Sequence, residues 1–341
     1  MSINNEDYFQ INTEILESFH KHRPPLDLYV FRENIGVLEP FYRKGGRLTD
    51  AQVSELAEIC ANGNLFVAHS DKKIYEAYMV RQLDLVLLDP NMTEGEIAEL
   101  CIVGIALRFS SFYEQPVPDM MQFLYHDVMV VTEYLWQDKH RIAPFMRRLF
   151  RKAEPARHAV NTMIVGTWLW MQMNQDYSRK ELDRVMLALV LHDAGMCKVP
   201  QFYLSKKGRL TQDEWDKMSK HTVASVKLMQ KCDLKFDELI RACFEHHERM
   251  DGSGYPQRTR AGQISVMGRL TALADSFSAM ICDRAYAKAK SPEQAGNELF
   301  ADSRYDRTMA SILSTAFVSG GPLSSLTDVD SKLEAFKNSQ A

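Results

Sequence analysis

The sequence predicts a mainly α protein, in which an all-α helical bundle follows a small N-terminal α/β domain. Apolar residues recur at helical spacing through most of the chain after residue 89, a pattern that is typical of packed helices. Before that point, short runs rich in strand-forming residues flank one amphipathic segment and are separated by turn residues. A length of 341 residues is enough for two domains.

The first 88 residues (1–88) are predicted to form the α/β domain. Residues 26–31 and 65–68 are rich in strand formers, residues 41–48 suggest a short strand and a turn, and residues 51–60 have helical spacing. This part of the sequence contains no glycine-rich phosphate loop and no cluster of metal-ligand residues. We therefore expect a regulatory or partner-binding domain.

Helical patterns organise the rest of the chain. Residues 89–151 are predicted to be a helical linker that a Pro-Val-Pro segment interrupts, with 119–151 as its second helix. Residues 152–320 are predicted to be the helical domain, and 321–341 a C-terminal tail that is either a peripheral helix or poorly ordered. Within the helical domain, the pattern covers 153–175, 180–191, 211–230, 236–247, 265–282 and 292–300.

Composition and charge exclude several classes of function. The formal net charge of −4 gives no basis for binding a nucleic acid polymer. No apolar run approaches ~18 residues, so no membrane-spanning helix is predicted, and the start of the chain lacks the basic and apolar segments of a signal peptide. Six dispersed cysteines without a CxxC pair are typical of a reducing compartment, and we expect a cytoplasmic protein.

Two ionisable residues that are adjacent in sequence mark the candidate site. His192 and Asp193 follow the apolar run 185–191, which is typical of a buried helix. Burying both side chains is costly unless a metal ion compensates, although a His-Asp pair can also simply cap a helix. Further candidate ligands lie in or beside apolar helical patterns, namely His158, His221, His246, His247, Glu248 and Asp275. Imidazole and carboxylate are the usual ligands of iron, manganese and zinc, so the set favours a two-metal site.

Four blocks of this sequence carry a resemblance to a known family. Leu-His-Asp-x-Gly at 191–195 is followed by His221, by His-His-Glu-Arg-Met-Asp-Gly-Ser-Gly-Tyr-Pro at 246–256, and by Ala-Asp-x-Phe at 274–277. The series resembles the HD-GYP family, a branch of the HD-domain superfamily of metal-dependent phosphohydrolases. The resemblance spans 158–306, less than half of the chain, and implies an all-α HD-GYP domain. The N-terminal domain loosely resembles the modules that often precede such domains.

The resemblance implies a binuclear site with a bridging water or hydroxide and two divalent ions, iron first and manganese next. Asp193 would bridge the metals, and His192 and Asp193 would be the catalytic residues. The implied metal ligands are His158, His192, Asp193, His221, His246, His247 and Asp275. Some family members hold a third metal through a glutamate four residues before the first histidine, which is Glu154 here. Pro155 favours the first helical turn and places Glu154 at a helix cap, so we expect two metals and leave the third open.

The resemblance also implies residues that hold the substrate. Gly254 and Tyr255 belong to the Gly-Tyr-Pro loop, and Arg284 matches an arginine suited to clamp a phosphate. Several family positions differ. The lysine that helps hold the scissile phosphate is Met196 in this chain, the second aspartate of Asp-x-Phe-Asp is Ser278, and residues 206–208 and 305–307 also depart from the family pattern. In an extended segment Lys198 would share a face with Met196 and could supply the missing charge.

The implied function is hydrolysis of cyclic di-GMP, a bacterial second messenger, to pGpG, to GMP or to both. Met196 is expected to reduce this activity, since methionine carries no charge to hold a phosphate. Two alternatives stay open: a cyclic-di-GMP sensor or interaction scaffold with little or no turnover, and a phosphohydrolase of another nucleotide. Protein partners are expected at the N-terminal domain and at the Gly-Tyr-Pro loop.

Overall fold

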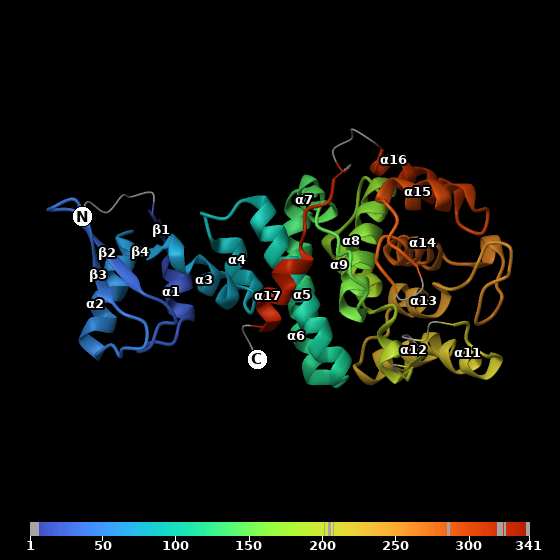
Figure 1. The fold of residues 1–341 in the computed structure, drawn as a ribbon, viewed down its shortest axis with the longest axis horizontal. Helices are drawn as coiled ribbons and strands as arrows, with labels where there is room; N and C mark the ends of the chain where they lie inside the picture. The colour runs from blue at the N-terminus through green and yellow to red at the C-terminus, as the bar shows by residue number, and fades with distance from the viewer. Residues whose placement is uncertain are drawn as a thin grey trace. The chain divides into compact units, whose positions relative to one another are not determined.

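The computed structural model describes residues 7–200, 202–203, 206, 208–284, 287–318, 323 and 325–338. It confirms a mainly helical chain with a small N-terminal sheet (Figure 1). The chain divides into two compact units, residues 1–101 with 336–341 and residues 102–335. The finer boundaries at residues 88 and 151 stay predictions, and the one at residue 320 lies outside the described residues.

The first unit contains a four-stranded antiparallel sheet in the order β1-β4-β2-β3. Its strands are β1 (Tyr8–Gln10), β2 (Leu28–Arg32), β3 (Val37–Tyr42) and β4 (Leu65–Ala68). The strand predicted at 65–68 is confirmed. The strand predicted within 41–48 instead begins at Val37 and therefore includes Pro40. Proline is tolerated there because β3 is an edge strand, and no strand among the described residues pairs with its outer side.

Short helices accompany this sheet. They are α1 (Thr13–Ser18), α2 (Asp50–Ala61), α3 (Lys72–Met79) and α4 (Leu83–Leu88), with the 3₁₀ helix η2 (His69–Asp71). Helix α2 is the one predicted at 51–60, and the Thr49 hydroxyl caps it by accepting a hydrogen bond from the Gln52 amide. Leu28 and Leu65 of the sheet are fully buried, so the unit has an apolar core of its own.

Residues 102–335 form the helical unit, into which the chain passes within α5. Its helices are α5 (Glu94–Glu114), α6 (Pro118–Gln137), α7 (Ile142–Met146), α8 (Pro155–Met173), α9 (Arg179–Leu191), α11 (Gln212–Met218), α12 (His221–Lys231), α13 (Asp237–Glu245), α14 (Val266–Met280), α15 (Pro292–Ala301), α16 (Arg307–Ala316) and α17 (Asp330–Asn338). Short 3₁₀ helices are η3 (Lys139–Arg141), η4 (Ala194–Lys198) and η5 (Ala261–Gln263).

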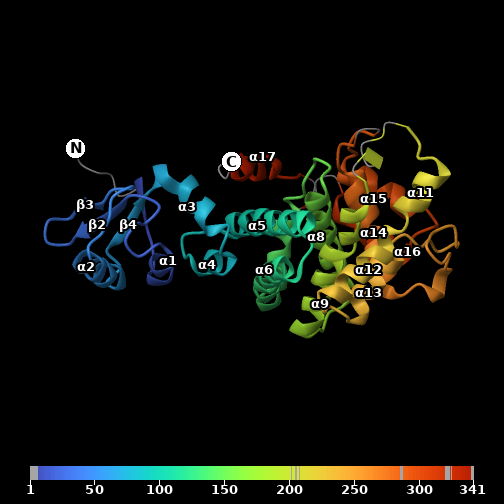
Figure 2. The same ribbon diagram turned by 90° about the horizontal axis from the view of Figure 1, so that it is seen from below.

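Helix α8 is the centre of this unit. It packs against α9 and α14, and α13 packs against α9, α12 and α14 (Figure 2). Thirteen of the nineteen residues of α8 are buried, including Val160, Met163 and Leu169, because the helix has neighbours on several sides. A helix that is apolar on most faces is buried in this way. The packed helices form a frame whose ends carry the polar residues of the candidate site.

Two predicted helices are interrupted. The helix predicted at 119–151 ends at Gln137, because Asp138 is extended and its side chain accepts from the His140 amide at 2.9 Å. The helix predicted at 211–230 divides between α11 and α12, where the Ser219 hydroxyl donates to a backbone carbonyl of the preceding turn. Helix α17 corresponds to the peripheral-helix alternative for the tail. In the described part of the chain, no helix has the length and apolar character needed to cross a membrane.

Candidate metal centre

Helix ends bring the predicted ligands together. His192 follows the last turn of α9, His221 begins α12 and His246 follows α13. The Nδ1 atom of each ring lies beside a backbone carbonyl, at 2.7 Å from Leu189 O for His192, 2.7 Å from Met218 O for His221, and 2.9 Å from Ala242 O for His246. A proton on Nδ1 is satisfied there, which leaves the Nε2 lone pair free to bind a metal.

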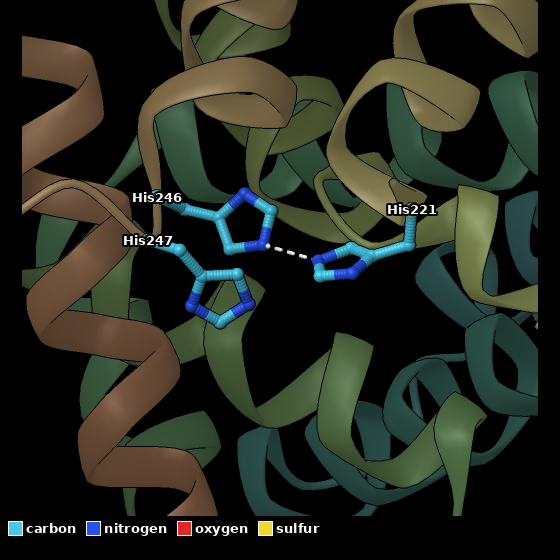
Figure 3. A group of neighbouring side chains, drawn as sticks. All are labelled: His221, His246 and His247. Carbon is cyan, nitrogen blue, oxygen red and sulfur yellow. Dashed lines mark hydrogen bonds between the residues drawn. The ribbon is translucent and has the colours of Figure 1, made fainter. Parts of the chain in front are cut away.

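The ligand atoms gather in two clusters. His158, His192 and Asp275 form one cluster, and His221, His246 and His247 form the other; within each, the candidate ligand atoms lie within 4.8 Å of one another. Figure 3 shows the second cluster, in which the rings of His246 and His247 lie opposite His221, and the Nε2 atoms of His221 and His246 are 3.3 Å apart. Such mixed histidine and carboxylate sets suit divalent cations.

Asp193 lies beside the second cluster. Its Oδ1 is 3.2 Å from His221 Nε2 and 3.9 Å from His246 Nε2. That oxygen is buried and has no hydrogen-bond partner among the described residues, and the same holds for His192 Nε2, which is 3.8 Å from Asp275 Oδ1. A buried polar atom without a partner is costly. A cation between these atoms would satisfy both, so the residues present fit a metal centre.

The charge state of the clusters also suits metal binding. Burial lowers the pKa of His246 and His247 well below the usual value, and the neighbouring imidazoles lower it further. Burial alone would raise the pKa of Asp275, but its hydrogen bond with His158 and the neighbouring imidazoles outweigh burial and hold that pKa well below its usual value. At neutral pH His246 and His247 are therefore neutral and Asp275 is a carboxylate, the forms that bind cations. Burial lowers the pKa of His192, but the carboxylates of Asp275 and Asp193 outweigh burial and raise it.

A close approach of backbones holds Asp193 beside His221. The Gly195 amide donates to Ser225 Oγ at 2.8 Å. A Cβ on Gly195 would lie 2.3 Å from both the His221 carbonyl oxygen and the Ser225 nitrogen. Only glycine fits, so η4 packs directly on α12 and its preceding residue Asp193 reaches the second cluster.

The Gly-Tyr-Pro loop lies against the second cluster. The Tyr255 ring stacks on His247 with centroids 4.7 Å apart, and its amide donates to the His247 carbonyl at 3.1 Å. Glu248, which the sequence places among the candidate ligands, has another role here. Its buried carboxylate accepts from the amides of Gln257 at 2.6 Å and Thr259 at 2.9 Å, and so holds the loop in place.

Replacing Gly254 by alanine is expected to destabilise the loop by about 1–3 kcal/mol, the usual cost of overpacking. A Cβ on Gly254 would lie 2.3 Å from the His247 carbonyl oxygen and 2.6 Å from the Arg249 nitrogen, and neither backbone atom can move away easily. Urea unfolding of the variant measures the loss. The matched control is Gly262→Ala, since a Cβ on Gly262 meets nothing within 4 Å. Equal stability of both variants would show that the loop shifts freely.

Glu154 and Arg284 occupy positions outside these clusters. Glu154 is the residue that precedes α8, as predicted, and its carboxylate accepts from Arg157 Nε at 3.1 Å. Its side chain is therefore engaged in an ion pair, which favours two metals over three. Arg284 follows the end of α14 and its amide donates to the Ala287 carbonyl at 2.9 Å. Its part in phosphate binding stays a prediction.

The prediction for Lys198 is wrong in its geometry. Residues Ala194–Lys198 form the 3₁₀ helix η4 rather than an extended segment. The Met196 amide donates to the Asp193 carbonyl at 3.0 Å, which bends the chain at once after the His-Asp pair. In a 3₁₀ helix, residues two apart point about 240° apart, so Lys198 does not share a face with Met196. Lys198 is exposed.

Sequence reasoning missed Tyr113 near the site. It lies in α5, within the segment predicted to be a linker, and its buried hydroxyl has no hydrogen-bond partner among the described residues. Burial raises the pKa of Tyr113 first, and the charge of Asp193 raises it further, which places the phenol within electrostatic reach of the centre. The apolar stripe around it gives no signal that separates Tyr113 from a core residue.

Comparison with known proteins places this centre in a family context. Residues 144–309 match the family described as HD domain. A cyclic di-GMP phosphodiesterase of Thermotoga maritima is 33% identical over 153 residues, which are 44% of this chain and 40% of that protein. The 3'3'-cGAMP-specific phosphodiesterase 2 of Vibrio cholerae is 35% identical over 125 residues, 36% of this chain and 24% of that protein. These matches span less than half of the curated relatives.

A solved structure also resembles the chain. Bd1817, an HDG"Y"P protein from Bdellovibrio bacteriovorus, matches with a TM-score of 0.56 and 14% sequence identity, over 91% of this chain and 99% of that one. At this identity the likeness shows the fold alone. The family match and the relatives confirm the resemblance on which the sequence analysis rests.

Proposed function

From the match of residues 144–309 to the family described as HD domain, we propose that the protein is a metal-dependent phosphodiesterase of cyclic dinucleotides. The observation that carries the proposal is the placement of Asp193. Its partnerless buried oxygen lies between histidines of one cluster, while its neighbour His192 belongs to the other. We propose that this carboxylate is shared by a metal ion on each cluster, because two-metal phosphohydrolases hold their ions close together.

Each cluster would hold one metal ion. His158, His192 and Asp275 would hold one divalent ion, and Asp193 would be shared with the second. The second ion would lie on the cluster of His221, His246 and His247. When bound, two such ions supply Lewis-acid chemistry that activates water near neutral pH and stabilises charge on a phosphoryl group. We propose iron first and manganese next, as the resemblance implies, and the imidazole and carboxylate donors are compatible with both ions.

Tyr255 would orient the substrate beside this centre. Burial raises its pKa first, and the carboxylates of Asp193 and Asp275 raise it further, so the phenol stays protonated and can donate a hydrogen bond. Its stacking on His247 fixes the ring. We propose that the hydroxyl contacts a phosphate oxygen, with Gly254 allowing the loop to approach and Arg284 as a further phosphate contact.

Cyclic di-GMP is the proposed substrate, with pGpG, GMP or both as products. The relatives support this class, since one is named for cyclic di-GMP and another for 3'3'-cGAMP, which are both cyclic dinucleotides of purines. The Gly-Tyr-Pro loop beside the second cluster supports it as well.

A second candidate function is a cyclic-di-GMP sensor or scaffold with little turnover. The observation that favours it is Met196, which stands where the resemblance implies a phosphate-holding lysine. The geometry of η4 strengthens this candidate, because Lys198 points away from the face of Met196. The loss of one cation at a phosphate costs a few kcal/mol of transition-state stabilisation, which is roughly a hundred-fold in rate.

The test begins with the metal content of protein purified without added metal, followed by product analysis with cyclic di-GMP under reducing conditions. Two equivalents of iron or manganese together with pGpG or GMP support the proposed enzyme. Two bound metals without turnover, in both iron and manganese forms, favour the sensor. Hydrolysis of another nucleotide alone would replace cyclic di-GMP as the substrate, and protein that binds no metal under any of these conditions would overturn both functions.

Replacing Met196 by lysine is expected to raise kcat/KM for cyclic di-GMP by about tenfold or more, because a cation returns to the scissile phosphate. Steady-state kinetics of the metal-loaded protein measure the change. Lys198→Ala is the matched control and is expected to change kcat/KM less than twofold, since that side chain is exposed and on another face of η4. A larger loss in Lys198→Ala than gain in Met196→Lys would restore Lys198 as the phosphate contact.

A further inference from the structure

An exposed tryptophan stands at the outer side of the Gly-Tyr-Pro loop. Trp215 lies in the middle of α11 and is 41% exposed. Its ring meets Tyr255 edge to face, with centroids 5.3 Å apart and an interplanar angle of 74°. Single exposed apolar residues are common on protein surfaces and need no explanation by themselves. Trp215 differs from such residues because it lies close to the candidate metal centre, which suggests a role in ligand binding.

Aromatic rings lead without interruption from the second cluster to Trp215. The centroids of His246 and His247 are 4.1 Å apart, those of His247 and Tyr255 are 4.7 Å apart, and Trp215 follows at 5.3 Å. Tyr255 also lies 6.2 Å from His221, on the other side of the same cluster. Trp215 is thus in direct contact with Tyr255, the side chain proposed to contact the phosphate.

Hydrogen bonds hold α11 in place beneath this ring. Thr211 and Glu214 form a capping box at its start, and the Glu214 carboxylate also accepts from Lys206 Nζ at 2.5 Å. The helix is short, so these contacts and the Tyr255 contact fix the orientation of the indole. A partly exposed aromatic ring whose orientation is fixed loses little side-chain entropy when a planar ligand stacks on it.

We propose that Trp215 is the platform on which one purine base of the cyclic dinucleotide stacks while its phosphodiester lies at the metal centre. The inference rests on the proposed function and names a specificity subsite for it. An indole carries no charge that would attract the phosphate, but its face suits a bicyclic base. Stacking of a base on an aromatic side chain contributes about 1–3 kcal/mol, and every purine can supply it.

The proposal predicts a loss of binding in Trp215→Ala. The Kd for cyclic di-GMP, measured by calorimetry on the metal-loaded full chain, is expected to rise about 5-fold to 150-fold, which corresponds to the stacking free energy. The KM is expected to rise by a similar factor while kcat changes less than threefold, because the reacting phosphate does not touch the indole. Trp215→Phe keeps an aromatic face and is expected to restore most of the affinity.

Two controls separate stacking from a structural effect. Trp136→Ala removes an equally exposed indole, 47% exposed on α6, and is expected to leave Kd and KM unchanged. Methyl 4-nitrophenyl phosphate is a phosphodiester without a base, and Trp215→Ala is expected to hydrolyse it at the parent rate. Metal content of each variant, measured in parallel, shows whether the centre stays intact.

The outcomes distinguish this inference from the proposed function. If the parent binds or hydrolyses cyclic di-GMP and Trp215→Ala does so equally well, the stacking role is overturned and the proposed function stands. If Trp215→Ala loses the base-free substrate and its metals as well, the residue is structural and the inference is again overturned. A parent protein that neither binds nor hydrolyses any cyclic dinucleotide would overturn both.

Discussion

Asp193→Asn is expected to lose at least one of the two metal ions and to lower the hydrolysis of cyclic di-GMP by about a thousand-fold or more, which corresponds to ~4 kcal/mol of transition-state stabilisation. The change removes one negative charge from a position 3.2 Å from His221 Nε2 and keeps the volume of the side chain. Imidazoles lie next to that position, and the Asp275 carboxylate belongs to the other cluster, so no carboxylate replaces the charge between the clusters. Elemental analysis and product analysis of the same preparation measure the two losses.

The matched control is Asp237→Asn, which removes a carboxylate that is 79% exposed at the start of α13. It is expected to keep both metals and the full rate, because surface ion pairs contribute little. Asparagine at residue 193 that retained two metals and parent turnover would remove Asp193 from the bridging position. The centre would then consist of two independent clusters, and the proposed division of ligands would fail.

Most of the predicted ligands were found from the sequence because they lie in short local patterns at helix ends, whereas Asp275 lies within α14 and belongs to the Ala-Asp-x-Phe block. His192 and Asp193 follow a continuous apolar run, and His246 and His247 precede a turn-rich loop, so local sequence alone indicates polar groups at the edge of a packed core. The structure brings these residues together with His158, His221 and Asp275. Their role as metal ligands stays a prediction that the experiment on Asp193 tests.

Features that depend on distant contacts could not be predicted. Glu248 stands within the motif, yet its carboxylate binds backbone amides of the loop that follows. Burial raises the pKa of Tyr113, and the charge of Asp193 raises it further, although the sequence shows the helix of Tyr113 only as an apolar stripe. The 3₁₀ geometry of η4 follows from the packing of Gly195 on Ser225, thirty residues away, and this packing separates Lys198 from the face of Met196.

Arg157 is the clearest long-range contact that the sequence does not reveal, and Asp330→Ala is expected to lower the free energy of unfolding by about 3–5 kcal/mol. The Arg157 side chain is fully buried, and the next residue in sequence is the predicted ligand His158. Its guanidinium donates to the carboxylates of Asp330 and Glu334 in α17, and Asp330 Oδ2 also accepts from the Arg151 amide at 2.7 Å. Without Asp330, the buried guanidinium of Arg157 loses one of its carboxylate partners in α17 and keeps Glu334.

A double-mutant cycle in urea isolates this interaction. Arg157→Met removes the charge and keeps much of the apolar stem, so the double variant with Asp330→Ala is expected to be more stable than the sum of the single losses predicts. The control is Lys152→Ala, whose ammonium is 60% exposed and 3.9 Å from Glu334, and which is expected to cost less than about 1 kcal/mol.

The cycle also decides whether α17 supports the metal centre. Arg157 precedes His158 on the first turns of α8, so a shift of the guanidinium is expected to move the backbone that carries this predicted ligand. We therefore expect Asp330→Ala to weaken metal retention at the cluster of His158, His192 and Asp275 as well as stability. If stability falls while both metals stay bound with unchanged affinity, α17 stabilises the fold without positioning His158. If stability falls no further than in Lys152→Ala, the Arg157 charge does not depend on Asp330.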